Sequence, residues 1–150
     1  MCTGNICRSP TAAGVLAHFV REAGLADVVQ VESAGTHDYH AGEAPDGRAQ
    51  DHAKRRGYDL SALRARQVRK RDFERFDLIL AMDQGHLEIL QSNCTAEQRG
   101  KIRMLLKGRD VPDPYYGGPE GFDRVLDMIE AACLALLDEV REKLRAVRRA

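Results

Sequence analysis

The chain has 150 residues, 43% of them hydrophobic, which suits one packed domain and excludes a disordered chain. Its 23 basic residues balance 23 acidic ones, so we expect no strong non-specific attraction to nucleic acid or to an anionic membrane. The sequence has no hydrophobic run of membrane-spanning length and no signal peptide, which predicts a cytoplasmic protein without membrane insertion. The four cysteines lack zinc-ligand spacing, and in a reducing compartment we expect free thiols.

Hydrophobic residues recur with helical spacing directly after the opening loop. This pattern predicts a helix over residues 10–23, with Ser9 as its cap and Pro10 in its first turn. The segment VVQVESAG, residues 28–35, predicts a strand that ends in a turn. A second helix is predicted over residues 45–56.

The second half of the chain continues to alternate between strand and helix patterns. FDLILAMD, residues 76–83, is a short continuous apolar run, typical of a strand that is buried on both faces. A short helix over 84–92, a strand over 101–106 and a long helix over 120–147 follow, and Cys133 lies in the apolar stripe of that last helix. The alternation predicts an α/β fold with a parallel sheet, in which ligands bind at the carboxyl ends of the strands.

The first ten residues, MCTGNICRSP, carry the chemistry of an anion site. A loop that enters a helix N-terminus directs unpaired N–H groups at a ligand, and Arg8 adds a planar fork suited to phosphate oxygens. We expect Gly4 to adopt backbone angles barred to other residues and Asn5 to tolerate the left-handed region. In this field Cys2 is expected to be a thiolate, hydrogen-bonded by the Ser9 hydroxyl and directed at phosphorus.

The alternative is a plain surface turn before a helix. A cysteine six residues before an arginine is weak evidence in a sequence this rich in arginine. The fuller string, with its Gly-Asn and Ser-Pro, is much less expected by chance and favours the phosphate site.

A second motif, VPDPYYGG, occupies residues 111–118. Asp-Pro and Gly-Gly are also ordinary turn signals. Cleavage of a phosphate ester, however, needs a proton for the leaving oxygen, and Asp113 beside a bound phosphate could hold that proton. Tyr115 and Tyr116 could form the wall of a slot for an aromatic leaving group.

These motifs resemble the low-molecular-weight protein tyrosine phosphatase family. The loop from Cys2 to Pro10 matches the family pattern Cys-x-Gly-Asn-x-Cys-Arg-Ser-Pro, and Asp113 to Gly117 matches its Asp-Pro-Tyr-Tyr-Gly. Further similar segments are SAGT at 33–36, ARQV at 65–68 and FDLILAMD at 76–83. The resemblance implies one three-layer α/β/α phosphatase domain, residues 1–150, with a four-stranded parallel sheet of the flavodoxin-like kind.

The resemblance also implies roles for individual residues. Cys2 would be the nucleophile, Arg8 would bind the phosphate, and Asp113 would act first as general acid and then as base. Tyr39 resembles the specificity-wall aromatic of the family. The substrate-binding residues would be Thr3, Gly4, Asn5, Ile6, Cys7, Ser9, Tyr39, Tyr115 and Tyr116.

The implied reaction passes through a phosphocysteine and needs no metal or cofactor, because loop amides and Arg8 stabilise the charge. The implied partner is a phosphotyrosine-containing protein or a small aryl phosphate. The sequence indicates nothing about oligomeric state.

Two features depart from the family pattern. Many relatives have a histidine at the position of Leu63 that bonds the loop asparagine, and leucine cannot support Asn5 in that way. The family also has a buried central strand before the catalytic cysteine, whereas only Met1 precedes Cys2 here. The first strand would therefore be missing, and we expect that the true coding start lies further upstream. A truncated chain, a closed-up sheet or a strand borrowed from another copy are alternatives.

Other interpretations stay open. Cys7 could form a reversible disulfide with Cys2, or it could simply pack. An arsenate reductase shares the fold and loop but needs further cysteines, of which Cys94 is a candidate, and an inactive phosphate-binding fragment is a third possibility.

Several other polar residues have no assigned role. The basic run at 64–71 reads as a solvated face or as a surface that steers acidic phosphopeptides, and His52 and His86 are expected on helix surfaces. Asp83 could orient the loop or cap the next helix.

Overall fold

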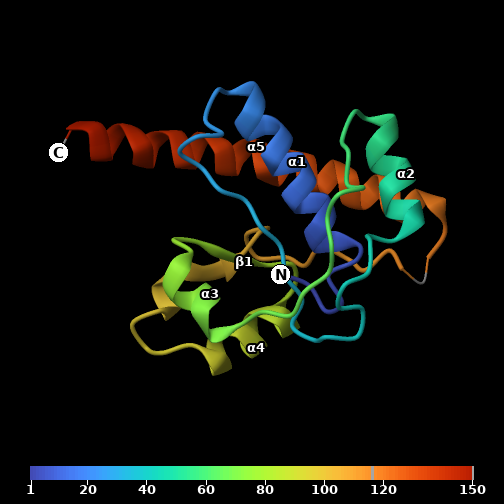
Figure 1. Ribbon diagram of the computed structural model, residues 1–150, viewed down its shortest axis with the longest axis horizontal. Coiled ribbons are helices and arrows are strands. Elements are labelled where there is room, and N and C mark those ends of the chain that lie inside the picture. The colour runs from blue at the N-terminus through green and yellow to red at the C-terminus, as the bar shows by residue number, and fades with distance from the viewer. Residues whose placement is uncertain (116, 150) are drawn as a thin grey trace.

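The computed structural model describes residues 1–115 and 117–149 (Figure 1). On one side, α5 (Pro119–Arg149) packs against α1 (Arg8–Glu22) and α2 (Gly47–Arg55). On the other side, α4 packs against both strands of a small sheet, and α3 lies nearby. The elements of this second side are α3 (Lys70–Arg75), β1 (Ile79–Ala81), α4 (Gln84–Asn93), the 3-10 turn Arg99–Lys101 and β2 (Ile102–Met104). The arrangement confirms an α/β domain.

Helix α5 forms because its hydrophobic residues repeat along one stripe, as the sequence predicts. The buried members of the stripe lie against α1 and α2, and Cys133 is among them with 1% of its surface exposed. These buried residues are Phe122, Val125, Leu126, Ile129, Cys133, Leu136 and Leu137. The contact between α5 and α1 fixes the start of α1, into which the opening loop runs.

The sheet is parallel, with Ile79 opposite Ile102 and Ala81 opposite Met104. Isolated backbone bridges and hydrogen bonds, called rungs below, extend the sheet beyond these two strands. The N-terminal amino group of Met1 donates to the Leu80 carbonyl, and the Met82 amide donates to the Met1 carbonyl. Cys2 forms a bridge with Gly35, and Gly35 forms a bridge with Gln67. The backbone therefore runs in parallel rows in the order 67, 35, 1–2, 81 and 104.

The predicted strand over residues 28–35 is wrong for most of its length. Among the described residues, this segment joins the neighbouring rows by backbone hydrogen bonds only at Ala34 and Gly35. Residues 28–33 have no ladder partner there, and Val28 is 56% exposed. A strand exists only where a neighbouring backbone pairs with it, so four regular strands remain a prediction.

The first helix begins two residues earlier than predicted, at Arg8. Cys7 occupies the cap position without a side-chain cap bond, and Ser9 is not the cap because it already lies inside the helix. Part of the basic run that was expected to be a solvated face forms the start of α3, and Arg66 pairs with Asp72 at 2.8 Å.

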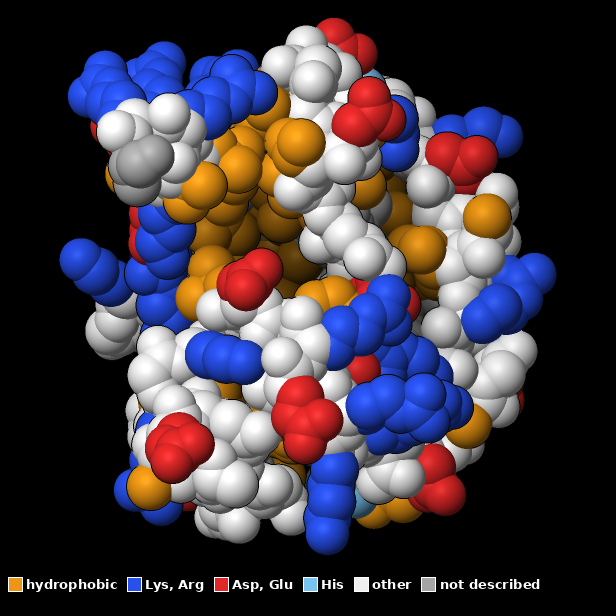
Figure 2. Space-filling view, turned by 60° about the vertical axis from the view of Figure 1, so that its left-hand side comes forward, with side chains coloured by type: hydrophobic (Ala, Val, Ile, Leu, Met, Phe, Trp, Pro, Cys, Tyr) orange, Lys and Arg blue, Asp and Glu red, His pale blue; other side chains and the backbone are white. Residues whose placement is uncertain are grey.

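Figure 2 shows a hollow lined with hydrophobic side chains on the face that carries the C-terminal end of α5, next to a cluster of Lys and Arg side chains. None of the helices, within the residues described, combines the length and hydrophobicity needed to cross a bilayer.

The packing of α5 on α1 gives a first prediction. Ile129 is fully buried, so Ile129→Ala should lower the free energy of unfolding by about 2–5 kcal/mol, since it removes apolar contacts and leaves a cavity. Leu134→Ala, on the same helix but 51% exposed, is the matched control and should change it by about 0.5 kcal/mol or less. Urea denaturation of both variants measures the difference, and equal losses would contradict this account of the core.

Candidate active site

The opening loop (residues 2–8) lies at the carboxyl edge of the sheet, where the fold predicts a ligand site. The Cys2 thiol is buried, with 3% of the residue exposed, and its sulfur lies 2.9 Å from the Ser9 hydroxyl. Its backbone is held on one side by the rung to Ala34 and Thr36. The sulfur therefore has a defined position at the entrance to α1.

Asn5 braces the loop from inside. Its φ of 60° confirms the predicted left-handed conformation, and its side-chain amide donates to the hydroxyls of Ser9 and Ser33 at 2.7 and 2.9 Å. The backbone amide of Arg66 donates to the Asn5 oxygen at 3.0 Å. The support that Leu63 could not give thus comes from the backbone of Arg66.

The role expected of Gly4 is wrong, because its φ is not among the positive values in the chain. A Cβ on Gly4 would lie 2.8 Å from the His40 ring, a partly exposed side chain that would have to shift to make room. Gly35 has a tighter constraint: a Cβ there would lie 2.6 Å from the Thr3 carbonyl oxygen and 3.2 Å from the Asn5 amide. The loop backbone rests directly on the backbone of Gly35.

Arg8 is held in place on two sides. It is only 5% exposed, and its Nη1 donates to Asp83 Oδ2 and to the Val111 carbonyl, both at 2.9 Å. Nη2 lies 3.7 Å from Asp113 Oδ2. The guanidinium therefore connects the opening loop to the ends of β1 and of the 111–113 segment.

One pocket brings these groups together. Cys2, Arg8 and Asp113 line it, with about 640 Å³ of empty space that includes the opening to solvent. Asp113 lies on the open side, its side chain 42% exposed, and its Oδ1 accepts the Tyr115 amide at 3.0 Å. The remaining lining residues are Thr3, Gly4, Ile6, Cys7, Tyr39, His40 and Tyr115.

The predicted aromatic walls stand at the rim of this pocket. Tyr39 is 69% exposed and stacks on His37, with ring centroids 4.9 Å apart. Tyr115 lies under the Arg48 guanidinium, which also donates to its carbonyl at 2.9 Å. Tyr116, the third aromatic predicted for the wall, lies outside the described residues.

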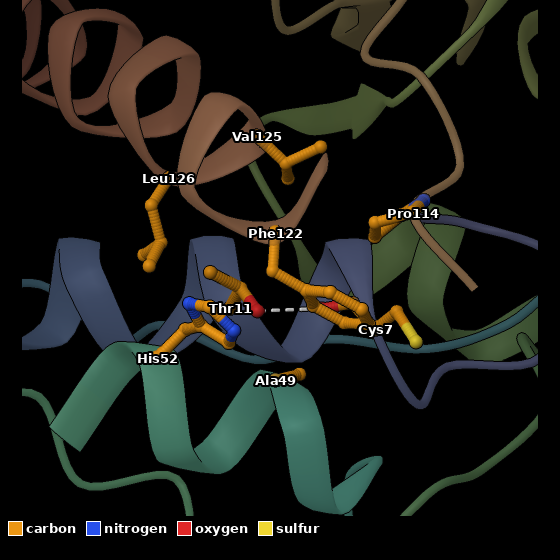
Figure 3. A pocket seen from close by; sticks show the side chains of 8 residues that line it. All are labelled: Cys7, Thr11, Ala49, His52, Pro114, Phe122, Val125 and Leu126. Atoms are coloured by element: carbon orange, nitrogen blue, oxygen red, sulfur yellow. Dashed lines mark hydrogen bonds between the residues drawn. The ribbon is translucent and has the colours of Figure 1, made fainter. Parts of the chain in front are cut away.

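Behind the loop lies a small cavity between α1, α2 and the start of α5 (Figure 3). Cys7, Ala49 and Phe122 form an apolar cluster there, and the His52 ring stacks on Phe122. Burial raises the pKa of Cys7 to about 12, so this thiol stays protonated. Cys2 and Cys7 are both free thiols. His52 was expected at the surface, but it is buried and pairs with Asp123 at 2.8 Å.

His86 was also expected at the surface, and it is 3% exposed. Its Nε2 lies 2.8 Å from the Thr3 hydroxyl and its Nδ1 lies 3.0 Å from Asp83 Oδ1. Burial lowers the pKa of His86 from 6.5 to about 4, despite the nearby Asp83 carboxylate. Sequence reasoning missed this residue, although its place three residues after Asp83, on one helix face, was a usable signal.

Asp83 performs both of its predicted tasks. It caps α4 by accepting the His86 amide at 2.8 Å, and it pairs with Arg8. Burial opposes ionisation, but the His86 amide and Arg8 hold the pKa of Asp83 below its usual range. The Asp83 carboxylate therefore balances the positive charge of the buried Arg8 guanidinium.

Comparison with known proteins agrees with the geometry. The family model of the low molecular weight phosphotyrosine protein phosphatases matches residues 1–146. The chain belongs to this family. A Streptomyces coelicolor low molecular weight protein-tyrosine-phosphatase is 43% identical over 153 residues, which cover 96% of this chain and 93% of that protein. The Homo sapiens low molecular weight phosphotyrosine protein phosphatase is 38% identical over 146 residues, covering 93% and 92%.

Solved structures of family members have the same fold. An Entamoeba histolytica protein tyrosine phosphatase with Hepes in its active site superposes with a TM-score of 0.91 at 38% identity, covering 95% of this chain and 94% of that one. The Vibrio vulnificus Wzb protein in complex with benzylphosphonate superposes with a TM-score of 0.82 at 31% identity, covering 92% and 94%.

The arsenate reductase interpretation needs a further cysteine near Cys2. Cys94 directly follows the last residue of α4 and packs with the cluster around Phe73 and Leu90, and it is not among the residues that line the pocket. The described geometry therefore does not place Cys94 where its thiol could attack the Cys2 sulfur of an arsenic adduct.

The contact between Gly35 and the loop gives a second prediction. Gly35→Ala should lower kcat/KM for an aryl phosphate by about 100-fold, because the methyl group must displace loop backbone that positions the reacting groups. Gly47→Ala is the control, since a Cβ there meets no atom within 4 Å, and it should keep its rates. Steady-state kinetics would contradict the account if the Gly35 variant matched the wild type.

Burial of neutral His86 gives a third prediction. The folded protein leaves His86 unprotonated down to about pH 4, whereas in the unfolded chain it binds a proton below about pH 6.5. The unfolded state therefore binds more protons between these values, so this group lowers stability as the pH falls from about 6.5 to about 4. Its contribution approaches about 1.4 kcal/mol per pH unit.

Urea denaturation of the wild type and of His86→Gln across this pH window measures the contribution. The variant should lose that part of the pH dependence. Parallel curves for the two proteins would contradict the prediction.

Proposed function

We propose that this protein hydrolyses phosphotyrosine through a phosphocysteine intermediate, with Cys2 as nucleophile, Arg8 as phosphate ligand and Asp113 as general acid and base. The observation that carries the proposal is the single pocket that these three side chains line, with the Arg8 guanidinium next to the Asp113 carboxylate. Membership of the phosphatase family supports the same reaction class.

In the first step the Cys2 thiolate attacks phosphorus, and an S–P bond forms as the bond from phosphorus to the tyrosine oxygen breaks. Asp113 gives its proton to that departing oxygen, so the phenol leaves neutral. The Ser9 hydroxyl, 2.9 Å from the sulfur, stabilises the thiolate, and Arg8 together with the loop amides binds the phosphoryl oxygens.

In the second step water attacks the phosphocysteine. Asp113, now a carboxylate, takes a proton from this water molecule while the water oxygen forms its bond to phosphorus. The S–P bond breaks, inorganic phosphate leaves and the Cys2 thiolate is restored. The half-exposed position of Asp113 suits this step, because water and the leaving group reach it from the same side.

The aromatic residues at the rim of the pocket favour an aromatic substrate. Tyr39 and Tyr115 lie at the mouth of a pocket whose floor is the opening loop, so a flat ring between them would bring its phosphate to Cys2. The substrate class is therefore a phosphotyrosine-containing protein, and a small aryl phosphate can stand in for it. Relatives named as phosphotyrosine phosphatases support this assignment.

We also propose that residues 1–150 act as one phosphatase domain with four parallel strands in the sheet. The rows at residues 35, 1–2, 81 and 104 support this, because they lie side by side in parallel, and Gln67 adds only a single bridge beyond Gly35. These rows hold Cys2 at the edge of the sheet where the pocket lies.

The roles of Cys2 and Asp113 give a fourth prediction. Cys2→Ser should abolish turnover of phosphotyrosine. Asp113→Ala should lower kcat by about 10²–10⁴, and the loss should be greater for phenyl phosphate than for 4-nitrophenyl phosphate, whose leaving group needs less help from an acid. Asp138→Ala, an exposed carboxylate on α5, is the control.

Kinetics on these substrates, with an arsenate-reduction assay in parallel, distinguish the alternatives. An Asp113 variant with full activity on phosphotyrosine would remove it as the acid. Arsenate reduction without phosphate release would replace the proposed function.

A further inference from the structure

We propose that His86 is a positioning residue that ties the two ends of the opening loop to the start of α4, through Thr3 at one end and through Asp83 and Arg8 at the other. The proposal rests on the function proposed above, because it concerns how that site is held in place. His86 itself does not line the pocket, so it acts through its neighbours.

The contacts form a continuous chain. Thr3 directly follows the nucleophile Cys2, and its hydroxyl lies 2.8 Å from His86 Nε2. On the other side of the ring, Nδ1 lies 3.0 Å from Asp83 Oδ1, and Asp83 Oδ2 accepts Arg8 Nη1 at 2.9 Å. The His86 side chain thus links Thr3, at one end of the opening loop, to the guanidinium of Arg8 at the other end.

The protonation state of the ring follows from these neighbours. Nδ1 faces the Asp83 Oδ1 oxygen at 3.0 Å without the alignment of a full hydrogen bond, and the same oxygen accepts the His86 backbone amide. A proton on Nδ1 is attracted by this carboxylate, whereas a lone pair would be repelled. Nε2 is then the acceptor, and the Thr3 hydroxyl donates to it. The lowered pKa of His86 agrees with a neutral ring.

This geometry has a consequence for the pocket. Thr3 lines the pocket, and its hydroxyl proton is directed at His86 and away from the phosphate. Thr3 therefore contributes to the site through the position of its backbone. A side chain at position 86 that loses the Thr3 contact would release the end of the loop next to Cys2, which weakens phosphate binding and lowers the rate together. Loss of the Asp83 contact has less effect, because Asp83 is also held by Arg8 and by the backbone amide of residue 86.

Three substitutions separate the two contacts. His86→Gln places an amide near the position of Nε2 and keeps a partner for Thr3. His86→Asn reaches only to the position of Nδ1 and leaves Thr3 without a partner, and Thr3→Val removes the hydroxyl with little change in shape. His52→Gln is the matched control, since His52 is a buried histidine paired with a carboxylate on α5 and does not line this pocket.

The experiment measures kcat/KM for 4-nitrophenyl phosphate and, by calorimetry, the Kd for inorganic phosphate. We expect His86→Asn and Thr3→Val each to lower kcat/KM and weaken phosphate binding by about tenfold. His86→Gln and His52→Gln should stay within about threefold of the wild type. The double variant Thr3→Val with His86→Asn should lose no more than either single one, because both break the same contact.

The proposal is overturned if His86→Asn keeps wild-type phosphate affinity, or if the two losses multiply in the double variant. An unchanged Kd accompanied by a lower melting temperature would assign His86 a purely structural role. Phosphate binding does not depend on turnover, so the two proposals fail separately. A wild-type protein that binds phosphate in a His86-dependent way but hydrolyses no aryl phosphate would refute only the proposed function.

Discussion

The buried guanidinium of Arg8 constrains the rest of the site. A charge that is 5% exposed must be paired and hydrogen-bonded, because an unpaired buried charge is strongly destabilising. Its partners come from segments far apart in the chain: Asp83 follows β1, and the Val111 carbonyl precedes the loop that carries Asp113. The hydrogen bonds of the Arg8 guanidinium therefore hold the sheet edge, the start of α1 and the loop that carries Asp113 next to one another.

Backbone contacts position the sulfur. The rung between Cys2 and Gly35 and the close approach of Gly35 to the Thr3 carbonyl place the loop within van der Waals contact of a neighbouring row. These contacts join backbone atoms, so no side-chain movement can relieve a disturbance there. A substitution that disturbs them therefore displaces the reacting atoms directly. This is why the sheet, short as its regular strands are, matters for the chemistry.

Buried polar groups make the loop rigid. Asn5 uses both its amide donors and its oxygen, and the Ser9 hydroxyl lies between the Asn5 amide and the Cys2 sulfur. Hydrogen bonds of this kind are strengthened in a low-dielectric interior, and a fully satisfied network specifies one arrangement. A site built in this way meets developing charge without reorganisation, which suits transfer of a phosphoryl group.

Local pattern determined the helices other than α3, the left-handed Asn5 and the place of Cys2 and Arg8 on one loop, since periodicity and turn chemistry act over a few neighbouring residues. The family resemblance, and not local pattern, implied that Asp113 joins them. The partners of these groups were decided only in three dimensions. The burial of His86 and the need for a glycine at position 35 depend on contacts with residues distant in sequence. The irregular backbone of 28–33 likewise reflects the absence of a described ladder partner. Sequence pattern reports what a segment prefers by itself, whereas burial and pairing depend on what packs against it.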